Sequence, residues 1–385
     1  MVIKMRKKLF LFIIIVFVTL STTGCWNYRG LNEMTIVAGT AIDKYDDHYK
    51  LSFEIYDLQG TGVGQPIKTK IIESTGKTIF DAVRNAKKRA ANKLYFAQSK
   101  IIIVSQRIVK EDGINSIIDW FARDPELRET LEVVISQEKS ASAILKADKV
   151  TSTTVSQDIQ NIVDKDQLMT SSTEKKPMYK IYNIINSEGV SLTLPAVHIT
   201  NNNEKDVCEV NGIAVFKEDK FVNYLSSEDT KYYLLAKGML DGGIITINTK
   251  INADDTELQN VSFEIISSKS SQKYTSQDEN DLRIKVTTNT EVVIGELKDR
   301  NHKITSTDIT KLEKQAGEIV KERIEDVITK IQTRYETDIL GYGKLLHSKN
   351  PKKWKEIKDV FNEKFINIKV DVESEIKILN TGFTR

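Results

Sequence analysis

Apolar and polar residues alternate in two groups of segments, one near the start of the chain and one in its last third. Residues 34–58 contain two such segments around the Asp-rich stretch 43–47, and the alternation is clearest at Leu51, Phe53 and Ile55. A period of two predicts strands with one buried face, and aspartates between two strands are typical of a turn. We therefore predict a β-hairpin with residues 43–47 as its turn.

A helical period replaces this alternation after Thr78. Thr78 with Asp81 three residues later fits a capping box, and one apolar helical face follows. The apolar run 100–105 then predicts a buried strand. Further strands and helices follow without strict βαβ repetition up to about residue 200. This mixture predicts the α+β fold class.

Alternation returns in the last third of the chain. Four segments there have period two: "GIITINTKI", "QNVSFEIISSK", "DLRIKVTTNTEVVIGEL" and "FINIKVDVESEIKIL". We predict that they form an antiparallel sheet. Residues 308–337 keep apolar positions at helical spacing, which predicts one long helix lying across that sheet. Pro351 marks the expected start of a second helix.

Polar stretches suggest where the domains meet. The stretch "ITNNNEKDV" (199–207) is the first polar break, so we predict an N-terminal α+β domain at 25–200. A small middle domain at 201–250 and a C-terminal domain at 251–385 would follow, giving about three domains. The Ser-, Thr- and Lys-rich stretch 170–177 reads as a surface loop.

The first 24 residues have the features of a bacterial signal peptide. Four basic residues precede an apolar run of twelve, Leu9 to Leu20, and small residues lead to Gly24 and Cys25. A spanning helix needs about 20 apolar residues, so this run is short for one. The end resembles a lipobox, although Thr22 stands where an apolar residue is usual. We predict cleavage between Gly24 and Cys25, with diacylglyceryl and N-acyl groups on Cys25. An ordinary secreted protein and an uncleaved anchor are the alternatives.

Charge and cysteine content narrow the possible partners. The chain has 56 Lys and Arg against 54 Asp and Glu, and removal of the signal would leave 52 against 54. A nearly neutral, evenly mixed chain argues against nucleic acid as a partner. Once Cys25 carries lipid, Cys208 is the single remaining cysteine, so no disulfide framework is possible. Cys208 lies in a predicted strand, and we expect it to be a small buried residue.

Several fragments resemble catalytic or binding motifs without completing them. Pro66 and a strand-like segment follow "GTGVGQ" (60–65), where a dinucleotide site requires a helix. "STGKT" (74–78) lacks the earlier glycine of a phosphate loop, and "DKYDD" (43–47) lacks the glycine and final glutamate of a calcium loop. The four histidines, which are widely separated, are His48, His198, His302 and His347. We therefore predict no catalytic residue, metal or cofactor, although the sequence leaves paired carboxylates open.

Four blocks of the sequence resemble one protein family. The first, "GCWNYRGLNEMTIVAGTAIDK", begins at Gly24, and the second is "IIDWFARDPELRETLEVVIS". The third is "NGIAVFKEDKFVNYLSSEDTKYYLLAKG", and the fourth, which extends from "TDILGYG" through "NPKKW", is near the end. Together they resemble the Ger(x)C family, the C-subunit lipoproteins of spore nutrient germinant receptors. Asn27, Gly30 and Asn223 depart from the pattern of the family.

The resemblance covers nearly the whole chain and implies a role. It implies an α+β protein of three domains that is lipid-anchored on the outer face of the inner spore membrane. The implied partners are two integral-membrane proteins, the A and B subunits. The implied role is to help sense small nutrients and trigger germination, without catalysis and without a cofactor.

Two other functions compete with this interpretation. A solute-binding lipoprotein of a transporter would have two parallel βαβ lobes around a cleft. A cell-envelope hydrolase would bring ionisable residues together in a cleft. The antiparallel pattern predicted for residues 244–380 argues against the first, and the missing motifs argue against the second.

Overall fold

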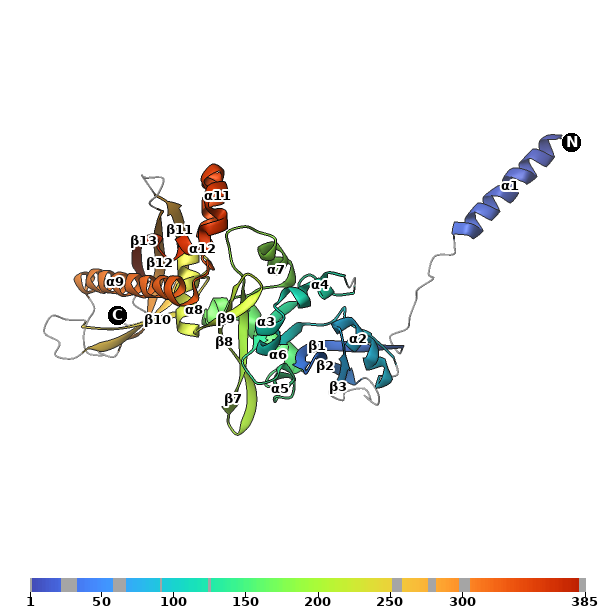
Figure 1. Cartoon of the computed structure of the whole chain (residues 1–385), viewed down its shortest axis with the longest axis horizontal. Helices are drawn as coiled ribbons and strands as arrows, with labels where there is room; N and C mark the ends of the chain where they lie inside the picture. Colours follow the sequence, from blue (N-terminus) through green and yellow to red (C-terminus); the bar gives the residue numbers. More distant parts are fainter. Residues whose placement is uncertain are drawn as a thin grey trace.

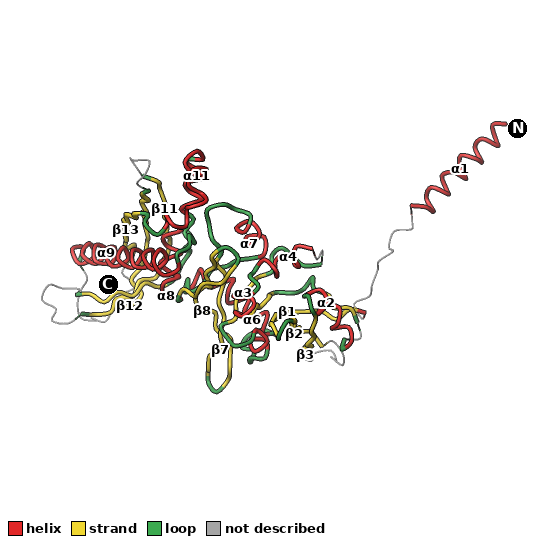
Figure 2. The backbone as a smooth tube through the Cα atoms, in the orientation of Figure 1, coloured by secondary structure: helices red, strands yellow, loops and turns green. Residues whose placement is uncertain are grey.

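The structure is a computed structural model that describes residues 2–21, 33–57, 67–90, 92–123, 126–250, 258–275, 282–297 and 305–380. Figures 1 and 2 show two groups of strands, each covered by helices. The helix α1 (Val2–Ser21) precedes them. Among the described residues, no helix is long and apolar enough to cross a membrane. The mixed strand and helix content confirms the predicted α+β class.

The first sheet has nine strands and combines parallel with antiparallel pairing. Its order is β3 (Lys68–Gly76), β2 (His48–Asp57), β1 (Met34–Tyr45), β5 (Ile101–Ser105), β6 (Glu132–Ser136), β7 (Thr193–Asn202), β8 (Lys205–Lys217) and β9 (Lys220–Leu225), with β4 (Lys93–Tyr95) beside β1. The pairs β1–β5, β5–β6 and β6–β7 are parallel, and the hairpins at both edges are antiparallel. The predicted hairpin around 43–47 is confirmed, since Tyr45 pairs with His48.

Helices cover both faces of this sheet, as the buried parallel strands require. Ile102 and Val104 of β5 face one core, and Ile101 and Ile103 face the other. The helices on the first face are α2 (Ile79–Asn85), α3 (Gln106–Glu111), α4 (Asn115–Arg123) and α7 (Met178–Ile185). The second face carries α5 (Ala141–Leu145) and α6 (Val155–Met169). Thr78 caps α2 by accepting the Asp81 N–H, as predicted.

The second sheet has four strands and one helical side. Its order is β10 (Ile244–Thr249), β11 (Gln259–Tyr274), β12 (Arg283–Leu297) and β13 (Lys369–Asn380). The helix α9 (Ser306–Lys330) lies across it, as Figure 1 shows, and α8 (Ser227–Lys237) packs beside α9. The remaining helical elements are the π-helical segment η3 (Ile331–Tyr335), α10 (Tyr342–Lys349), α11 (Pro351–Ile357), and α12 (Phe361–Phe365). Two short 3₁₀ segments are η2 (Ala86–Lys88) and η4 (Lys358–Val360).

Two details of this second part differ from the prediction. The sheet is mixed rather than antiparallel, because β13 pairs with β12 in the parallel direction. The helices α9–α12 connect these two strands, and such a long crossover allows parallel pairing. The long helix also ends at Tyr335 rather than at 337, because Glu336 adopts a left-handed backbone (φ 51°).

The expected domain boundary at 200 falls inside the first sheet. Residues 199–207 form the ends and turn of the β7–β8 hairpin, in which Asn202 pairs with Lys205. Residues 201–250 are divided between the two sheets, because β8 and β9 complete the first and β10 opens the second. The largest core cluster crosses this division, since Ile213 and Leu225 of the first sheet pack with the second.

Candidate functional site

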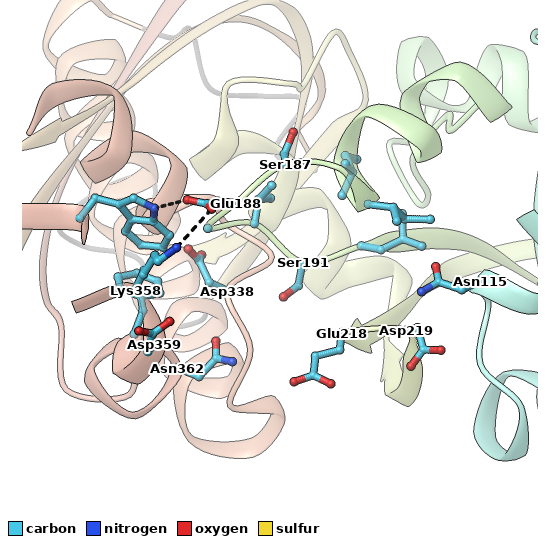
Figure 3. Close-up of a pocket in the computed structure, with 17 residues that line it drawn as sticks. Asn115, Ser187, Glu188, Ser191, Glu218, Asp219, Asp338, Lys358, Asp359 and Asn362 are labelled. Carbon is cyan, nitrogen blue, oxygen red and sulfur yellow. Dashed lines mark hydrogen bonds and ion pairs between the residues drawn. The ribbon is translucent and has the colours of Figure 1, made fainter. Parts of the chain in front are cut away.

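A cleft of about 540 Å³ lies where the two parts of the chain meet, and we call it the junction cleft. Figure 3 shows Asn115, Glu218 and Asp219 on one wall and Asp359 and Asn362 on the other. The segment after α7, which includes Ser187, Glu188 and Ser191, crosses between the walls. Because both parts of the chain contribute residues to the walls, the shape of the cleft depends on the relative orientation of the two parts.

Glu188 joins the two walls of the junction cleft. Its carboxylate accepts a hydrogen bond of 2.6 Å from the indole nitrogen of Trp354 and lies 3.7 Å from the Lys358 ammonium group. The bond from Trp354, with the charge of Lys358, lowers the pKa of Glu188. Trp354 also packs edge-on against Phe361, with ring centroids 5.1 Å apart. Both aromatic residues belong to the core cluster of the second part.

The segment "TDILGYG" (337–343) reaches the junction cleft at Asp338. Both carboxylate oxygens of Asp338 accept backbone N–H groups at 2.8 Å, one from Gly341 and one from Gly343. The carbonyl of Asp338 accepts the Ser191 N–H at 2.7 Å, which ties this loop to the other part of the chain. Burial raises the pKa of Asp338 to about 6, and the N–H bonds oppose that shift.

Two glycines allow the backbones to meet at this point. A Cβ atom on Gly189 would lie 2.4 Å from the Gly343 carbonyl carbon, and one on Gly343 would lie 2.8 Å from the Gly189 Cα. Gly189 also has a positive φ of 72°, which favours glycine. The Lys344 N–H donates to the Gly189 carbonyl at 2.7 Å as a result of this close approach.

A group of buried charges lies between the two sheets, and we call it the junction cluster. Its members are Glu132, Glu174, Lys176, Tyr233, Lys237 and Asp338. The Lys176 ammonium group contacts the Glu174 carboxylate, and both side chains are at most 3% exposed. Glu174 also accepts hydrogen bonds from Thr193 Oγ1 at 3.0 Å and from the Tyr233 hydroxyl at 3.2 Å. Burial lowers the pKa of Lys176.

Lys237 extends this cluster toward the junction cleft. Its ammonium group donates to the Tyr233 hydroxyl at 2.7 Å and to the Ile339 carbonyl at 2.8 Å. Burial lowers its pKa to about 8, while the nearby Asp338 carboxylate raises it. Lys237 therefore links the Tyr233 hydroxyl, which donates to Glu174 near the first sheet, to the Ile339 carbonyl in the loop that follows η3. The cluster therefore connects the two parts of the chain.

Glu132 is the least satisfied acid of the junction cluster. It lies in β6 with no exposed surface, and its Oε2 accepts the Lys176 N–H at 3.1 Å. Its Oε1 has no hydrogen-bond partner among the described residues. Burial raises the pKa of Glu132 to about 7. A carboxyl in this setting is protonated in the folded chain at a pH where it is ionised in the unfolded chain.

The raised pKa of Glu132 predicts that the folded chain loses stability as the pH rises from 5 to 8. Its pKa is raised from 4.5 to about 7, so the folded chain binds more protons than the unfolded chain in this window. The free energy of unfolding should therefore fall as the pH rises, by about 3 kcal/mol from this group. Urea unfolding at several pH values measures the fall. Glu132→Gln should remove it, and an unchanged slope in this variant would contradict the assignment.

The arrangement is suited to positioning rather than to covalent chemistry. The carboxylates of the junction cluster are used to bind backbone N–H groups, hydroxyl groups and an ammonium group. No group of three His, Cys, Asp or Glu side chains in the described part of the chain could hold a metal ion. The contacts hold the two sheets in one relative orientation.

The sequence-predicted residues lie elsewhere or outside the described residues. Gly24, Cys25 and the "GTGVGQ" fragment fall outside them. Cys208 is buried in β8, as expected, and burial raises the pKa of its thiol to about 12. Arg123 pairs with Asp119 at 3.0 Å at the surface.

The stretch 170–177 is the clearest error of the sequence interpretation. It was predicted to be a surface loop, yet Ser171, Thr173, Glu174 and Lys176 are each at most 2% exposed. The loop is buried because it runs between the sheets, where the Thr173 hydroxyl donates to the Gly212 carbonyl at 2.8 Å. The local composition does not predict this burial, since charged residues in a polar stretch are usually exposed to solvent.

Family comparisons place both parts of the chain in one group. Residues 27–199 match the model described as spore germination protein N-terminal domain. Residues 211–382 match the model described as spore germination B3/GerAC like, C-terminal.

Individual relatives agree with these matches over nearly their whole length. Spore germination protein KC of Bacillus subtilis is 23% identical, over 98% of this chain and 97% of its own. Spore germination protein B3 of the same organism is 22% identical, over 96% and 97%. The crystal structure of the GerBC protein superposes with a TM-score of 0.55 at 18% identity, and it covers 89% of this chain. The chain therefore belongs to the GerAC-like family of spore germination proteins, the Ger(x)C family.

Proposed function

We propose that this chain is the lipid-anchored C subunit of a spore nutrient germinant receptor. In this proposal Cys25 holds the chain on the outer face of the inner spore membrane, beside two integral-membrane partners, the A and B subunits. The observation that carries the proposal is that both domains of one germination family match, together covering most of the chain. The lipobox-like end of the signal, Gly24 and Cys25, supports the anchor.

The proposed mode of action is contact between proteins, without catalysis. The contacts of the junction cluster and around the junction cleft hold the two sheets together, and the carboxylates of Asp338 and Glu174 are already occupied by donors from the chain itself. Such a scaffold suits a subunit that transmits or stabilises a conformation of its partners. The nutrient class proposed for the receptor is small molecules such as amino acids, sugars or nucleosides.

The solute-binding alternative receives less support. A transporter-linked binding protein of that type has two parallel-sheet lobes around its cleft. The second sheet pairs β10 with β11 and β11 with β12 in the antiparallel direction. Only β12 and β13 are parallel there, so the described strands do not form two such lobes.

Affinity purification from detergent-solubilised inner spore membrane tests the proposal. Two multi-pass membrane proteins should copurify with the wild-type chain and be depleted with Cys25→Ala, because the lipid places the chain beside them. Two acyl chains bind a membrane stably, whereas one binds marginally. Mass spectrometry identifies the copurifying proteins and the modified cysteine. Recovery of a transporter would favour the solute-binding alternative, and a soluble chain without membrane partners would refute the proposal.

A further inference from the structure

We propose that the pocket beside α2 binds anionic phospholipid headgroups of the membrane that holds the anchor. We call it the α2 pocket. This inference rests on the proposed anchoring at Cys25 and adds a second membrane contact, made by the folded domain itself. Its role would be to orient the anchored chain on the membrane surface.

The segment around the α2 pocket is strongly basic. Residues 84–93 read "RNAKKRAANK", which contains five Lys and Arg residues and no acid. Arg84, Lys87, Lys88 and Arg89 are all exposed. This local charge contrasts with the nearly neutral chain as a whole. Clusters of four to eight basic residues near a membrane attract anionic lipids.

The α2 pocket combines these charges with an apolar floor. Its volume is about 450 Å³, which falls in the range of sites for small ligands. Leu94, Phe96 and Trp120 form the floor, and Phe80 stands at the rim with 52% of its surface exposed. Phe96 and Trp120 pack edge-to-face with ring centroids 6.2 Å apart. A lipid headgroup has matching parts, namely a phosphate for the cations and glycerol carbons for the floor.

Four cations surround this floor, and they outnumber the acids. They are Arg84, Lys87, Lys93 and Arg123, and Glu126 is the one acid among the described lining residues. Lys93 pairs with Glu126, and Arg123 pairs with Asp119. The Arg84 guanidinium lies 4.8 Å from the centroid of the Phe80 ring, a cation–π contact, and it forms no ion pair with an acid among the described residues. The rim therefore attracts anions.

The position of the α2 pocket is set by the pairing of β4 with β1. Lys93 of the rim pairs with Met34, the first residue of β1. Met34 is nine positions after Cys25 in the sequence, and nine residues span at most about 30 Å when fully extended. An anchor at Cys25 thus keeps the pocket within about 30 Å of the membrane. Figure 1 shows α2 beside β1, at the end of the two-sheet body opposite the second sheet. Because β1 is the first strand after Cys25, this basic end is the one nearest the anchor.

Binding of the full mature chain with Cys25→Ala to phospholipid vesicles tests this contact in the absence of the covalent lipid anchor. Co-sedimentation should show binding to vesicles of phosphatidylglycerol with phosphatidylcholine and none to phosphatidylcholine alone. Arg84→Ala with Lys87→Ala should weaken binding about 30-fold, since each basic residue near the surface contributes about fivefold. Binding should be lost at 1 M salt, where the screening length is about 3 Å.

A matched control uses Lys349→Ala with Lys352→Ala, two exposed lysines of the second part, and should bind like the parent. Three outcomes would overturn the inference. In the first, the chain does not bind anionic vesicles, and in the second it binds neutral vesicles equally well. In the third, the pocket variant and the control variant lose the same amount of vesicle binding. If the pocket instead binds an acidic protein, the chain would not bind vesicles. Arg84→Ala with Lys87→Ala would then reduce the amount of that protein that copurifies with the chain. Cys25-dependent membrane fractionation is measured separately, so a failed vesicle test with intact anchoring leaves the proposed function standing.

Discussion

Asp338→Ala is expected to lower the free energy of unfolding by about 3 kcal/mol. The substitution leaves the Gly341 and Gly343 N–H groups without their acceptor, and each unpaired buried donor costs about 1 to 3 kcal/mol. It also removes the carboxylate that lies near the Lys237 ammonium group. Urea unfolding followed by circular dichroism measures the change, because the free energy of unfolding is linear in denaturant.

The pH dependence of this loss identifies its cause. Burial raises the pKa of Asp338 from 3.8 to about 6, so its contribution to stability is larger below this range and falls as the pH rises through it. The difference between wild type and Asp338→Ala should therefore be larger at pH 5 than at pH 8. Asp359→Ala, at an exposed carboxylate on the wall of the same cleft, is the control and should change stability by less than about 0.5 kcal/mol. Equal effects of the two variants would contradict the role given to Asp338.

Lys176→Met is expected to destabilise the chain by about 3 to 5 kcal/mol. Removing one partner of a buried ion pair leaves the other charge without compensation, and Glu174 has no exposed surface. The hydrogen bonds from Thr193 and Tyr233 retain part of the stabilisation of the Glu174 carboxylate. Thermal and urea unfolding give the magnitude.

The neighbouring lysine provides a matched control for this prediction. Lys175 has the same side chain, but it pairs with Asp164 at 2.6 Å at the surface, where ion pairs contribute at most about 1 kcal/mol. Lys175→Met should therefore have a small effect. Adding Glu174→Gln to Lys176→Met should recover much of the loss, because the neutral amide keeps hydrogen-bonding capacity without the charge. A loss for Lys176→Met no larger than for Lys175→Met would show that the buried pair carries little stability.

Local features were predictable from the sequence because their causes lie within a few residues. The hairpin turn at 43–47, the Thr78 cap of α2 and the start of α11 at Pro351 all follow from turn and capping chemistry. Each of these predictions is confirmed.

The site was less predictable because its contacts join distant parts of the chain. Glu174 and Tyr233 are 59 residues apart, and the Thr337 hydroxyl donates to the Phe216 carbonyl across 121 residues. The segment "TDILGYG" was noticed for its resemblance to a family pattern, and its structural role became visible only when Asp338 was placed against Ser191. No local pattern shows which charged residues will be enclosed.

The sequence by itself determined the class of the fold and most of its strands, turns and helix starts, because periodicity and capping depend on neighbouring residues. The tertiary structure alone decided the parallel pairing of β13 and the extension of the first sheet past residue 200. It also decided the burial of Glu174 and Lys176 between the sheets. These features depend on which distant surfaces pack together, and burial of a charge is a property of that packing rather than of the residue.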